Sequence, residues 1–236
     1  MSQHIAVLVP CYNAAEWIEE LVRRITPFVA ASDIYLVDDG SADDTRSAIE
    51  KSGAVLLVHP QNKGKGEALR TGFAAILNAG YDGLITLDAD LQHLPEHLPA
   101  FLEAAPEFDI VVGTRAYELR NMPVHRWATN HVTSMIVSWV GGTRIHDSQS
   151  GYRYLSARAV RDIPLSTVKY DMESEQLIRA ARMGMKIGEV PVETVYCGSA
   201  SYINPVADTV RFIRMACRNL FWRPRSPEEK LNSDFT

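Results

Sequence analysis

Residues 83–93 read GLITLDADLQH, and this stretch indicates the fold more directly than any other part of the chain. Its first half is a short run of branched aliphatic residues, which is typical of a buried strand in a parallel sheet. Two carboxylates, Asp88 and Asp90, follow at once with Ala89 between them. Ligands bind outside the carboxyl ends of the strands in such sheets, so this pair is a candidate binding site.

Two carboxylates at the end of a buried strand are costly unless a positive charge lies between them. A hard divalent cation is the natural partner, because it takes oxygen ligands and leaves positions for phosphate oxygens. Gln92 continues the alternation and supplies a further oxygen. The alternative is a helix-capping Asp beside a surface Asp, since Asp-x-Asp is a common pattern.

Similar strand-like runs recur on both sides of this stretch, and each is bounded by Pro, Gly or Asp. Amphipathic stretches at 14–28 and 65–79 separate them, which predicts right-handed βαβ units and a mostly parallel sheet flanked by helices. Asn13 and Ser41 stand at capping distances before two of the expected helices. The expected strands are Ile5–Val9, Ile34–Val37, Val55–Val58, Leu84–Leu87 and Ile110–Val112.

The pattern changes after residue 113. We expect helices at 124–140, 172–183 and 206–222, a turn-like polar segment at 147–154, and an extended segment at 187–196. The whole forms one α/β domain over 1–222. Its parts are a first half at about 1–115, a second half at about 116–205 and a basic amphipathic helix at about 206–222, followed by a polar tail at 223–236.

Composition excludes several classes of protein. The chain has 236 residues, of which 46% are hydrophobic, so it is long enough and apolar enough to bury a sizeable core. A formal net charge of −5 argues against nucleic acid as a partner, because nucleic-acid-binding proteins carry a basic footprint. The chain contains no run of about 18 apolar residues, so the sequence predicts no membrane span. The N-terminus lacks the pattern of a signal peptide, so we expect a cytoplasmic protein. Cys11, Cys197 and Cys217 show no metal-ligand spacing, and we expect them to be reduced thiols.

Two further motifs follow other expected strands. Asp38 and Asp39 begin the sequence Asp-Asp-Gly-Ser, whose carboxylates suit ribose hydroxyls or a base N–H, although the same residues also make a good turn. The segment 62–66, Asn-Lys-Gly-Lys-Gly, brings positive charge and close-approaching backbone to the start of a helix. It matches neither the P-loop nor the dinucleotide-binding fingerprint.

His93 and His97 are four residues apart just after the acidic pair, a spacing that invites a zinc hypothesis. Pro95 lies between them and predicts that a helix begins there, so the two rings do not share an established helical turn. We therefore favour packing or supporting roles for both histidines.

The ordered set of motifs resembles the family 2 glycosyltransferases, and within them the dolichyl-phosphate mannose synthase-like branch. The resemblance covers about residues 4–196, with Ala14-Ala15 as a departure, since relatives often carry Glu after Tyr-Asn. The motifs are 9–13 (VPCYN), 37–45 (VDDGSADDT), 62–66 (NKGKG), 87–93 (LDADLQH), 113–115 (GTR), 147–153 (DSQSGYR), Glu175 and 189–192 (EVPV).

This resemblance implies a GT-A fold, a nucleotide-diphospho-sugar donor and Mg²⁺ or Mn²⁺ as cofactor. It makes the first half, at about 1–115, the nucleotide-sugar half and the second half, at about 116–205, the acceptor half. It implies metal ligands among Asp88, Asp90 and Gln92, and places Arg115 nearest the phosphates. The other residues it implicates are, for the donor, Pro10, Tyr12, Asn13, Asp38, Asp39, Lys65, Gly66, Ala89 and Arg153, and, for the acceptor, Arg126, Asn130, Ser150 and Arg153.

Sugar transfer makes negative charge grow on the leaving diphosphate, which a divalent cation and arginines stabilise. Attack from the opposite face inverts the anomeric centre. An alcohol acceptor needs a general base, whereas a lipid phosphate is already ionised. Any base would come from Asp171, Glu173 and Glu175, of which Asp171 and Glu175 share a helical face; the alternative is charge placed to favour the helix dipole.

The expected helix at 206–222 has apolar positions on one face, with Arg211, Arg214 and Arg218 beside them. Such a basic amphipathic helix predicts contact with the cytoplasmic face of an anionic membrane, and a core-packing helix with a solvated arginine edge is the alternative. The segment 132–140 is a second candidate for that surface.

The leading hypothesis is therefore a metal-dependent inverting glycosyltransferase with a lipid-linked acceptor, such as a polyprenyl phosphate. One alternative is transfer to another glycan or lipid. Two others are a phosphatase of the haloacid-dehalogenase type and a non-catalytic nucleotide-sugar-binding protein. The sequence identifies neither the sugar nor the oligomeric state.

Overall fold

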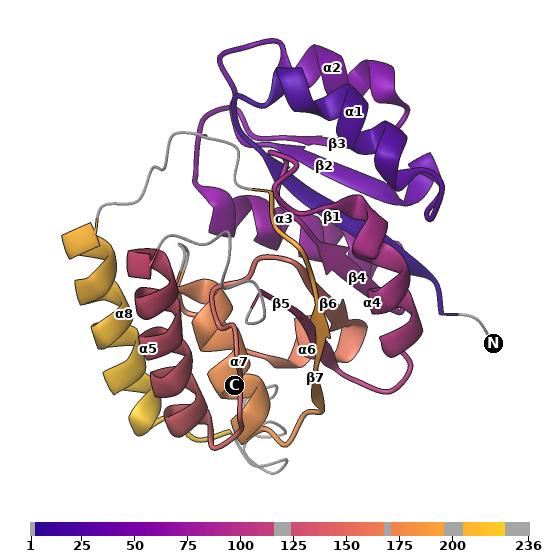
Figure 1. The fold of residues 1–236 in the computed structure, drawn as a ribbon. Coiled ribbons are helices and arrows are strands. Elements are labelled where there is room, and N and C mark those ends of the chain that lie inside the picture. Colours follow the sequence, from indigo (N-terminus) through magenta and orange to yellow (C-terminus); the bar gives the residue numbers. More distant parts are fainter. Residues whose placement is uncertain (1–2, 116–123, 168–170, 196–204, 225–236) are drawn as a thin grey trace, which may run out of the picture.

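The computed structural model describes residues 3–115, 124–167, 171–195 and 205–224 (Figure 1). Within these ranges a seven-stranded sheet forms the centre of the molecule, in the order β3-β2-β1-β4-β6-β5-β7. The strands are β1 (Ile5–Cys11), β2 (Ile34–Asp38), β3 (Val55–Val58), β4 (Gly83–Thr86), β5 (Ile110–Thr114), β6 (Arg153–Ser156) and β7 (Ile187–Pro191).

The five expected strands of the first half are confirmed, and the pairs β1–β2, β1–β4, β2–β3 and β5–β7 are parallel. The prediction of a turn-like segment at 147–154 is wrong at its end, because residues 153–156 form β6. This strand runs antiparallel between β4 and β5. A four-residue strand that begins with an arginine has too weak a hydrophobic pattern to be recognised from sequence.

Helices cover both faces of the sheet (Figure 1). Alternate residues of β1 supply the two cores: Val7 and Val9 pack with α1, α2 and α4, whereas Ala6 and Leu8 pack with α3, α5, α6 and α7. The helices are α1 (Ala15–Ile25), α2 (Thr45–Ser52), α3 (Lys65–Asn78), α4 (Leu98–Ala104), α5 (Val124–Gly141), α6 (Ala157–Asp162), α7 (Met172–Arg182) and α8 (Pro205–Leu220), with short 3-10 turns at Ala31–Asp33 and Pro95–His97.

The expected helices begin close to their predicted residues, but the expected caps are wrong. The N-cap residues of α1 and α2 are Ala14 and Asp44, and neither makes a side-chain capping bond. Asn13 instead accepts a hydrogen bond from the Ala42 amide through Oδ1, and the Ser41 hydroxyl accepts one from the Asn13 amide. Both side chains therefore tie two loops together at the edge of the sheet.

The carboxyl ends of the parallel strands meet at this edge, as a parallel sheet requires. The loops after β1, β2, β4 and β5 carry the residues that the sequence singled out, from Tyr12 to Arg115. The α8 helix lies outside the sheet layers and packs on α5 and α7 (Figure 1).

Candidate functional site

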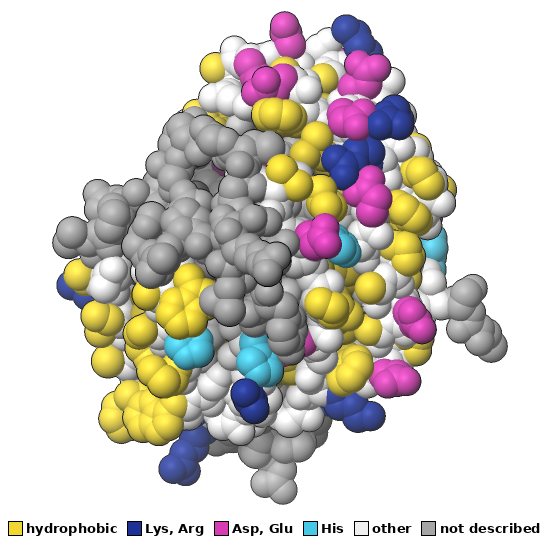
Figure 2. Space-filling model, viewed as in Figure 1, with side chains coloured by type: hydrophobic (Ala, Val, Ile, Leu, Met, Phe, Trp, Pro, Cys, Tyr) yellow, Lys and Arg dark blue, Asp and Glu magenta, His cyan; other side chains and the backbone are white. Residues whose placement is uncertain are grey.

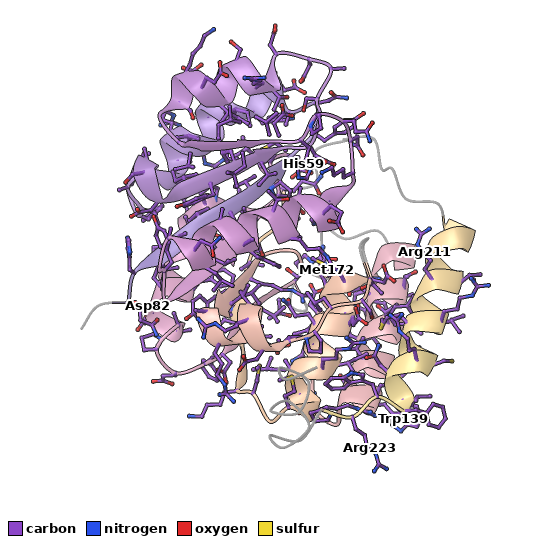
Figure 3. All side chains as sticks on the ribbon, turned by 180° about the vertical axis from the view of Figure 1, so that it is seen from behind. His59, Asp82, Trp139, Met172, Arg211 and Arg223 are labelled. Carbon is purple, nitrogen blue, oxygen red and sulfur yellow. The ribbon has the colours of Figure 1, made fainter. Side chains whose placement is uncertain are left out.

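On the nucleotide side, Asp39 holds the glycine-rich loop in place. Its Oδ1 accepts the Lys63 amide at 2.9 Å and lies 2.6 Å from Nδ1 of His59, and its Oδ2 accepts the Gly64 amide at 2.7 Å. All three contacts come from the segment that follows β3. His59, the first residue of this segment, is labelled in Figure 3. These contacts give Asp39 a loop-holding role, and its predicted contact with a donor stays a prediction.

Asp38 lies at the same edge and accepts the Ser41 amide through Oδ1 at 2.9 Å. Between them Gly40 has a φ of +69°, and a Cβ on it would lie 2.4 Å from the backbone of Gln61. Only glycine fits there, because the conformation is left-handed and the second loop is in contact. Loops 38–42 and 61–64 thus form one rim, beside which the Tyr12 ring is exposed.

The acidic pair follows β4. The Asp88 carboxylate binds Lys65 Nζ through Oδ1 at 2.7 Å, and its backbone amide donates to Nδ1 of His93 at 3.3 Å. Asp90 accepts two hydrogen bonds from Gln92, at 3.1 Å from the backbone amide and at 2.7 Å from Nε2. Each carboxylate is thus held in a fixed orientation at the carboxyl end of the strand.

The charges of the pair are unequally compensated. Burial would raise the pKa of Asp88, but the ammonium group of Lys65 and the neighbouring positive groups lower it to about 2. The pKa of Asp90 is raised, first by burial and then by the negative charge of Asp88. The site therefore retains negative charge that a cation would stabilise.

His93 supports the acidic pair without being charged. Burial lowers its pKa to about 4, and its ring packs on Tyr152 with centroids 5.3 Å apart. His97 accepts the Glu193 amide through Nε2 at 3.0 Å. Pro95 begins a short 3-10 helix, as expected, and both histidines have the supporting roles that we favoured over zinc.

Arg115 follows β5 and forms a bidentate pair with Asp147, with N–O distances of 2.7 and 2.9 Å. Asp147 is fully buried, and burial would raise its pKa, but hydrogen bonds and charge from Arg115 lower it. The Arg115 guanidinium also acts on the charges of Asp88 and His93. It is thus near enough to the acidic pair to act on its charge, and it retains partial exposure.

Arg153 has a different position from the one expected for a phosphate ligand. It is 1% exposed, and its three guanidinium nitrogens donate to the backbone carbonyls of Ser150, Glu173 and Ser148 at 2.6–2.8 Å. Burial lowers its pKa to about 10. The structure supports a role in holding loop 148–150 against α7, and direct contact with donor or acceptor stays a prediction.

The predicted base Glu175 is fully buried and surrounded by donors. It accepts hydrogen bonds from the amide and hydroxyl groups of Ser166 and Thr167 and pairs with Arg179 and Arg218. Burial would raise its pKa, but these hydrogen bonds lower it. A carboxylate with this environment is a poor proton acceptor, so the geometry favours a structural role.

Sequence reasoning set Glu173 aside because it does not share a face with Asp171 and Glu175. In the structure that other face points at the site: Glu173 lies 3.2 Å from Lys65 Nζ. No local sequence pattern indicates this pairing, because Lys65 and Glu173 are distant in the chain. Asp171 precedes α7 and lines a separate hollow with Arg211, Arg214 and Arg218.

The remaining predicted residues lie at several places around this site. Pro10, Lys65, Asp88 and Arg153 line one small cavity together with Gly151 and Glu173. Asn130 is buried in α5, where its Oδ1 lies 3.4 Å from the Ser134 hydroxyl, and Ser150 is buried beside Tyr152. Ala89 is buried in the loop that follows β4, and Gly66 is buried at the start of α3. The side chain of Arg126, like Cys197, lies outside the described residues.

The acidic pair has the donor set of a divalent metal site. Two carboxylates and the Gln92 amide offer hard oxygen donors, and burial together with the charge of Asp88 raises the pKa of Asp90, so a cation would stabilise its ionised form. Among the side chains that the structure describes, no three His, Cys, Asp or Glu residues form a metal-binding group. The residues fit an ion that takes its other ligands from water or from the phosphates of a substrate.

A mostly parallel sheet with one antiparallel insertion and an acidic pair after its fourth strand defines a glycosyltransferase fold of the GT-A type. Residues 6–165 match the family described as Glycosyl transferase family 2. The chain belongs to this family, and it is a glycosyltransferase.

Its relatives include an undecaprenyl-phosphate mannosyltransferase of Micrococcus luteus, 34% identical over 81% of this chain and 83% of the relative. A UDP-N-acetylglucosamine–dolichyl-phosphate N-acetylglucosaminyltransferase of Methanococcus voltae is 31% identical over 81% of this chain and 86% of its own. Among solved structures, glucosyl-3-phosphoglycerate synthase of Mycobacterium tuberculosis with Mn²⁺, UDP-glucose and phosphoglyceric acid superposes with a TM-score of 0.73, at 21% identity, over 95% of this chain and 81% of that one.

Proposed function

We propose that the enzyme transfers a sugar from a nucleotide-diphospho-sugar to a polyprenyl phosphate, with inversion at the anomeric carbon. The observation that carries the acceptor class is the environment of Glu175, which is saturated with hydrogen bonds and has a lowered pKa. An acceptor that is already ionised needs no base at this position. The lipid-phosphate acceptors in the names of the relatives from Micrococcus luteus and Methanococcus voltae support the same class.

The donor would lie along the carboxyl edge of the sheet. Asp38 and the exposed ring of Tyr12 would contact the nucleoside, and Asp88 and Asp90 would face the diphosphate end; their position at one edge of the sheet supports this. Asp88, Asp90 and Gln92 would hold the divalent cation, Mg²⁺ or Mn²⁺, which when bound stabilises the charge that grows on the leaving diphosphate. Arg115, fixed by Asp147, adds a second positive charge on the same side.

The acceptor implies a membrane, and α5 and α8 offer a surface for it. Large apolar side chains are exposed along both helices, and Figure 2 shows hydrophobic side chains gathered over this part of the molecule. The arginines of α8 lie beside them, in the arrangement that suits an anionic lipid surface. We call the exposed apolar side chains of this surface the α5/α8 face. They are Val132, Met135, Trp139, Val210, Ile213 and Phe221, the last of which directly follows α8.

No helix among the described residues is long and apolar enough to cross a membrane. The proposal is therefore contact with the surface of a bilayer. In Figure 3, Trp139 and Arg223 lie toward the same end of the helix pair, and Arg211 lies toward the other end. An aromatic ring and a basic side chain at one end suit the interface of an anionic bilayer.

The donor is identified by a thermal-shift screen of the purified protein against UDP- and GDP-sugars, each with Mn²⁺ and with chelator. Ligand binding to the folded state raises the unfolding temperature with the logarithm of saturation, so a selective shift identifies the nucleotide. We expect a shift of several degrees for one nucleotide-sugar, and its loss on chelation. No shift with any donor, in the presence of Mn²⁺ and lipid vesicles, would contradict the proposal.

The haloacid-dehalogenase alternative has no support left, because the family and the fold are those of glycosyltransferases. The non-catalytic alternative predicts binding without turnover. Product formation on a polyprenyl phosphate distinguishes it from the proposed function.

A further inference from the structure

Lys65, the first residue of α3, has its ammonium group between two carboxylates. Nζ lies 2.7 Å from Asp88 Oδ1 and 3.2 Å from Glu173 Oε1. Asp88 follows β4 in the nucleotide half, and Glu173 is in α7 of the acceptor half. One side chain therefore connects the acidic pair to the helix on the other side of the site.

This ion pair is partly buried. A Cβ built on Gly151 would lie 3.0 Å from Lys65 Nζ and 3.3 Å from Asp88 Oδ2, so backbone packs directly against both groups. The Glu173 side chain is 10% exposed and that of Lys65 26%. Water screens such a pair far less than it screens a surface pair, and its effect on a neighbouring ion is correspondingly large.

The charges around Lys65 do not cancel. Lys65 pairs with Asp88 and Glu173, and Asp90 adds a third negative charge that acts on Asp88. With Asp147 there are four carboxylates, against which stand the ammonium group of Lys65 and the guanidinium groups of Arg115 and the buried Arg153, so one negative charge is in excess. Burial alone would lower the pKa of Lys65, but the charges of Asp88 and Glu173 raise it above its ordinary value, so the side chain stays charged. Lys65 thus offsets part of the negative charge that would attract a metal ion.

We infer that Lys65 is a built-in counter-ion that competes with the divalent cation for Asp88 and makes tight metal binding depend on a nucleoside diphosphate. The inference rests on the proposed function for the identity of the donor. Lys65 has a flexible four-carbon stem, which allows its ammonium group to exchange a carboxylate for a phosphate oxygen nearby. The negative charge of the diphosphate then favours both cations at once. Lys65 is in this account a positioning residue of the acidic pair.

The test is Mn²⁺ binding measured by the electron paramagnetic resonance signal of the free ion, with and without UDP or GDP. We expect wild-type protein to bind Mn²⁺ weakly alone and at least tenfold more tightly with the matching nucleotide. Lys65→Met should bind Mn²⁺ at least tenfold more tightly than wild type without nucleotide, and the gain from nucleotide should shrink. Lys65→Arg keeps the positive charge and should resemble wild type.

Lys63→Met is the matched control, because it removes the same charge from the same loop at an exposed position. It should leave Mn²⁺ binding unchanged. Circular dichroism melting of each variant confirms that it is folded. Glu173→Gln is a second variant, in which Asp88 is the one remaining carboxylate partner of Lys65 among the residues that the structure describes. It should bind Mn²⁺ no more tightly than wild type.

Equal or weaker Mn²⁺ binding by Lys65→Met, with nucleotide-dependent binding intact in wild type, would overturn this inference alone. Absence of Mn²⁺ binding in every form, with either nucleotide, would overturn it together with the metal assignment of the proposed function. The two failures are distinguishable because the first leaves the wild-type response in place.

Discussion

At the scale of single residues, the acids of the acceptor half differ in what surrounds them. Glu175 is held by Ser166, Thr167, Arg179 and Arg218, whereas Glu173 faces Lys65 and the acidic pair. Glu175 therefore stabilises the packing around α7, whereas Glu173, two positions earlier on the same helix, faces the site. Their helical spacing alone could not show this, because the partners come from distant parts of the chain.

Glu175→Gln should lower the free energy of unfolding by about 3–5 kcal/mol, because it leaves the buried Arg179 without its charge partner. Urea denaturation at pH 7 measures the change. Glu50→Gln is the matched control, since Glu50 pairs with Arg46 on the exposed surface and such pairs contribute about 0–1 kcal/mol. Loss of sugar transfer in Glu175→Gln with an unchanged free energy of unfolding would instead restore a catalytic role.

The same carboxylate predicts a pH dependence of stability. Its pKa is lowered in the folded protein, so its contribution is complete above the ordinary value of 4.5 and is lost as the pH falls through the folded-state value. Asp88, with a pKa of about 2, loses its contribution between about 3.8 and 2. Urea midpoints between pH 7 and pH 3 should fall less in Glu175→Gln than in wild type. Parallel curves for the two proteins would contradict this.

Asp90→Ala should abolish sugar transfer and leave the free energy of unfolding unchanged or slightly higher. Burial and the charge of Asp88 disfavour the Asp90 carboxylate, as its raised pKa shows, so its removal relieves that cost. Thermal melting and a transfer assay measure the two effects. Full activity of the variant in washed, metal-free buffer would contradict the metal assignment.

At the scale of elements, α5 and α8 differ from the other helices in the apolar surface that they leave exposed. Trp139 is 73% exposed and Phe221 87%, values that a helix buried in a core would not show. The membrane contact predicted from the sequence of 206–222 and 132–140 thus has an exposed face to support it. Arg218 also reaches back to Glu175, so the alternative of a helix packed with an arginine edge describes part of the same element.

Ile213→Asp should weaken binding to vesicles that contain anionic lipid by about tenfold, since burial of an isoleucine side chain contributes about 1.5–3 kcal/mol. Vesicle flotation at two salt concentrations measures the binding and the arginine contribution together. Phe28→Asp, at an exposed apolar residue near the end of α1, is the matched control and should bind as wild type. Equal loss of binding in both variants would contradict a specific α5/α8 face.

At the scale of the whole molecule, the sheet joins the two halves that the sequence suggested. β5 belongs to the first half, yet its sheet neighbours are β6 and β7, which come from the second. β4 also belongs to the first half, and one of its two neighbours, β6, comes from the second. The halves therefore share one sheet and both hydrophobic cores.

A fragment of residues 1–115 should for this reason show no cooperative unfolding transition, whereas the full chain should unfold in one. In the fragment, β5 has no neighbouring strand and the Arg115 guanidinium has no Asp147. Urea titration followed by circular dichroism and by tryptophan fluorescence compares the two. A cooperative transition in the fragment would show that the nucleotide half is an independent domain.

The parallel part of the fold was predictable because each of its strands carries a continuous apolar run between turn residues. β6 was not, because its pairing with β4 and β5 depends on neighbours that are distant in sequence. The acidic pair and Arg115 were predictable from their place after strands and from the order of the motifs. The partners Asp147 for Arg115 and Glu173 for Lys65 required the structure, since charge pairing across a fold leaves no local pattern.

The central claim is transfer of a sugar to a polyprenyl phosphate, and one measurement tests it most directly. Radiolabelled nucleotide-sugars are incubated with the enzyme, Mn²⁺ and undecaprenyl phosphate in detergent, and label that enters the organic phase is counted. We predict incorporation from one donor, its loss with chelator, and its loss in Asp90→Ala. Binding of donor and Mn²⁺ without any lipid-soluble product, with polyprenyl phosphates of several lengths, would contradict the account.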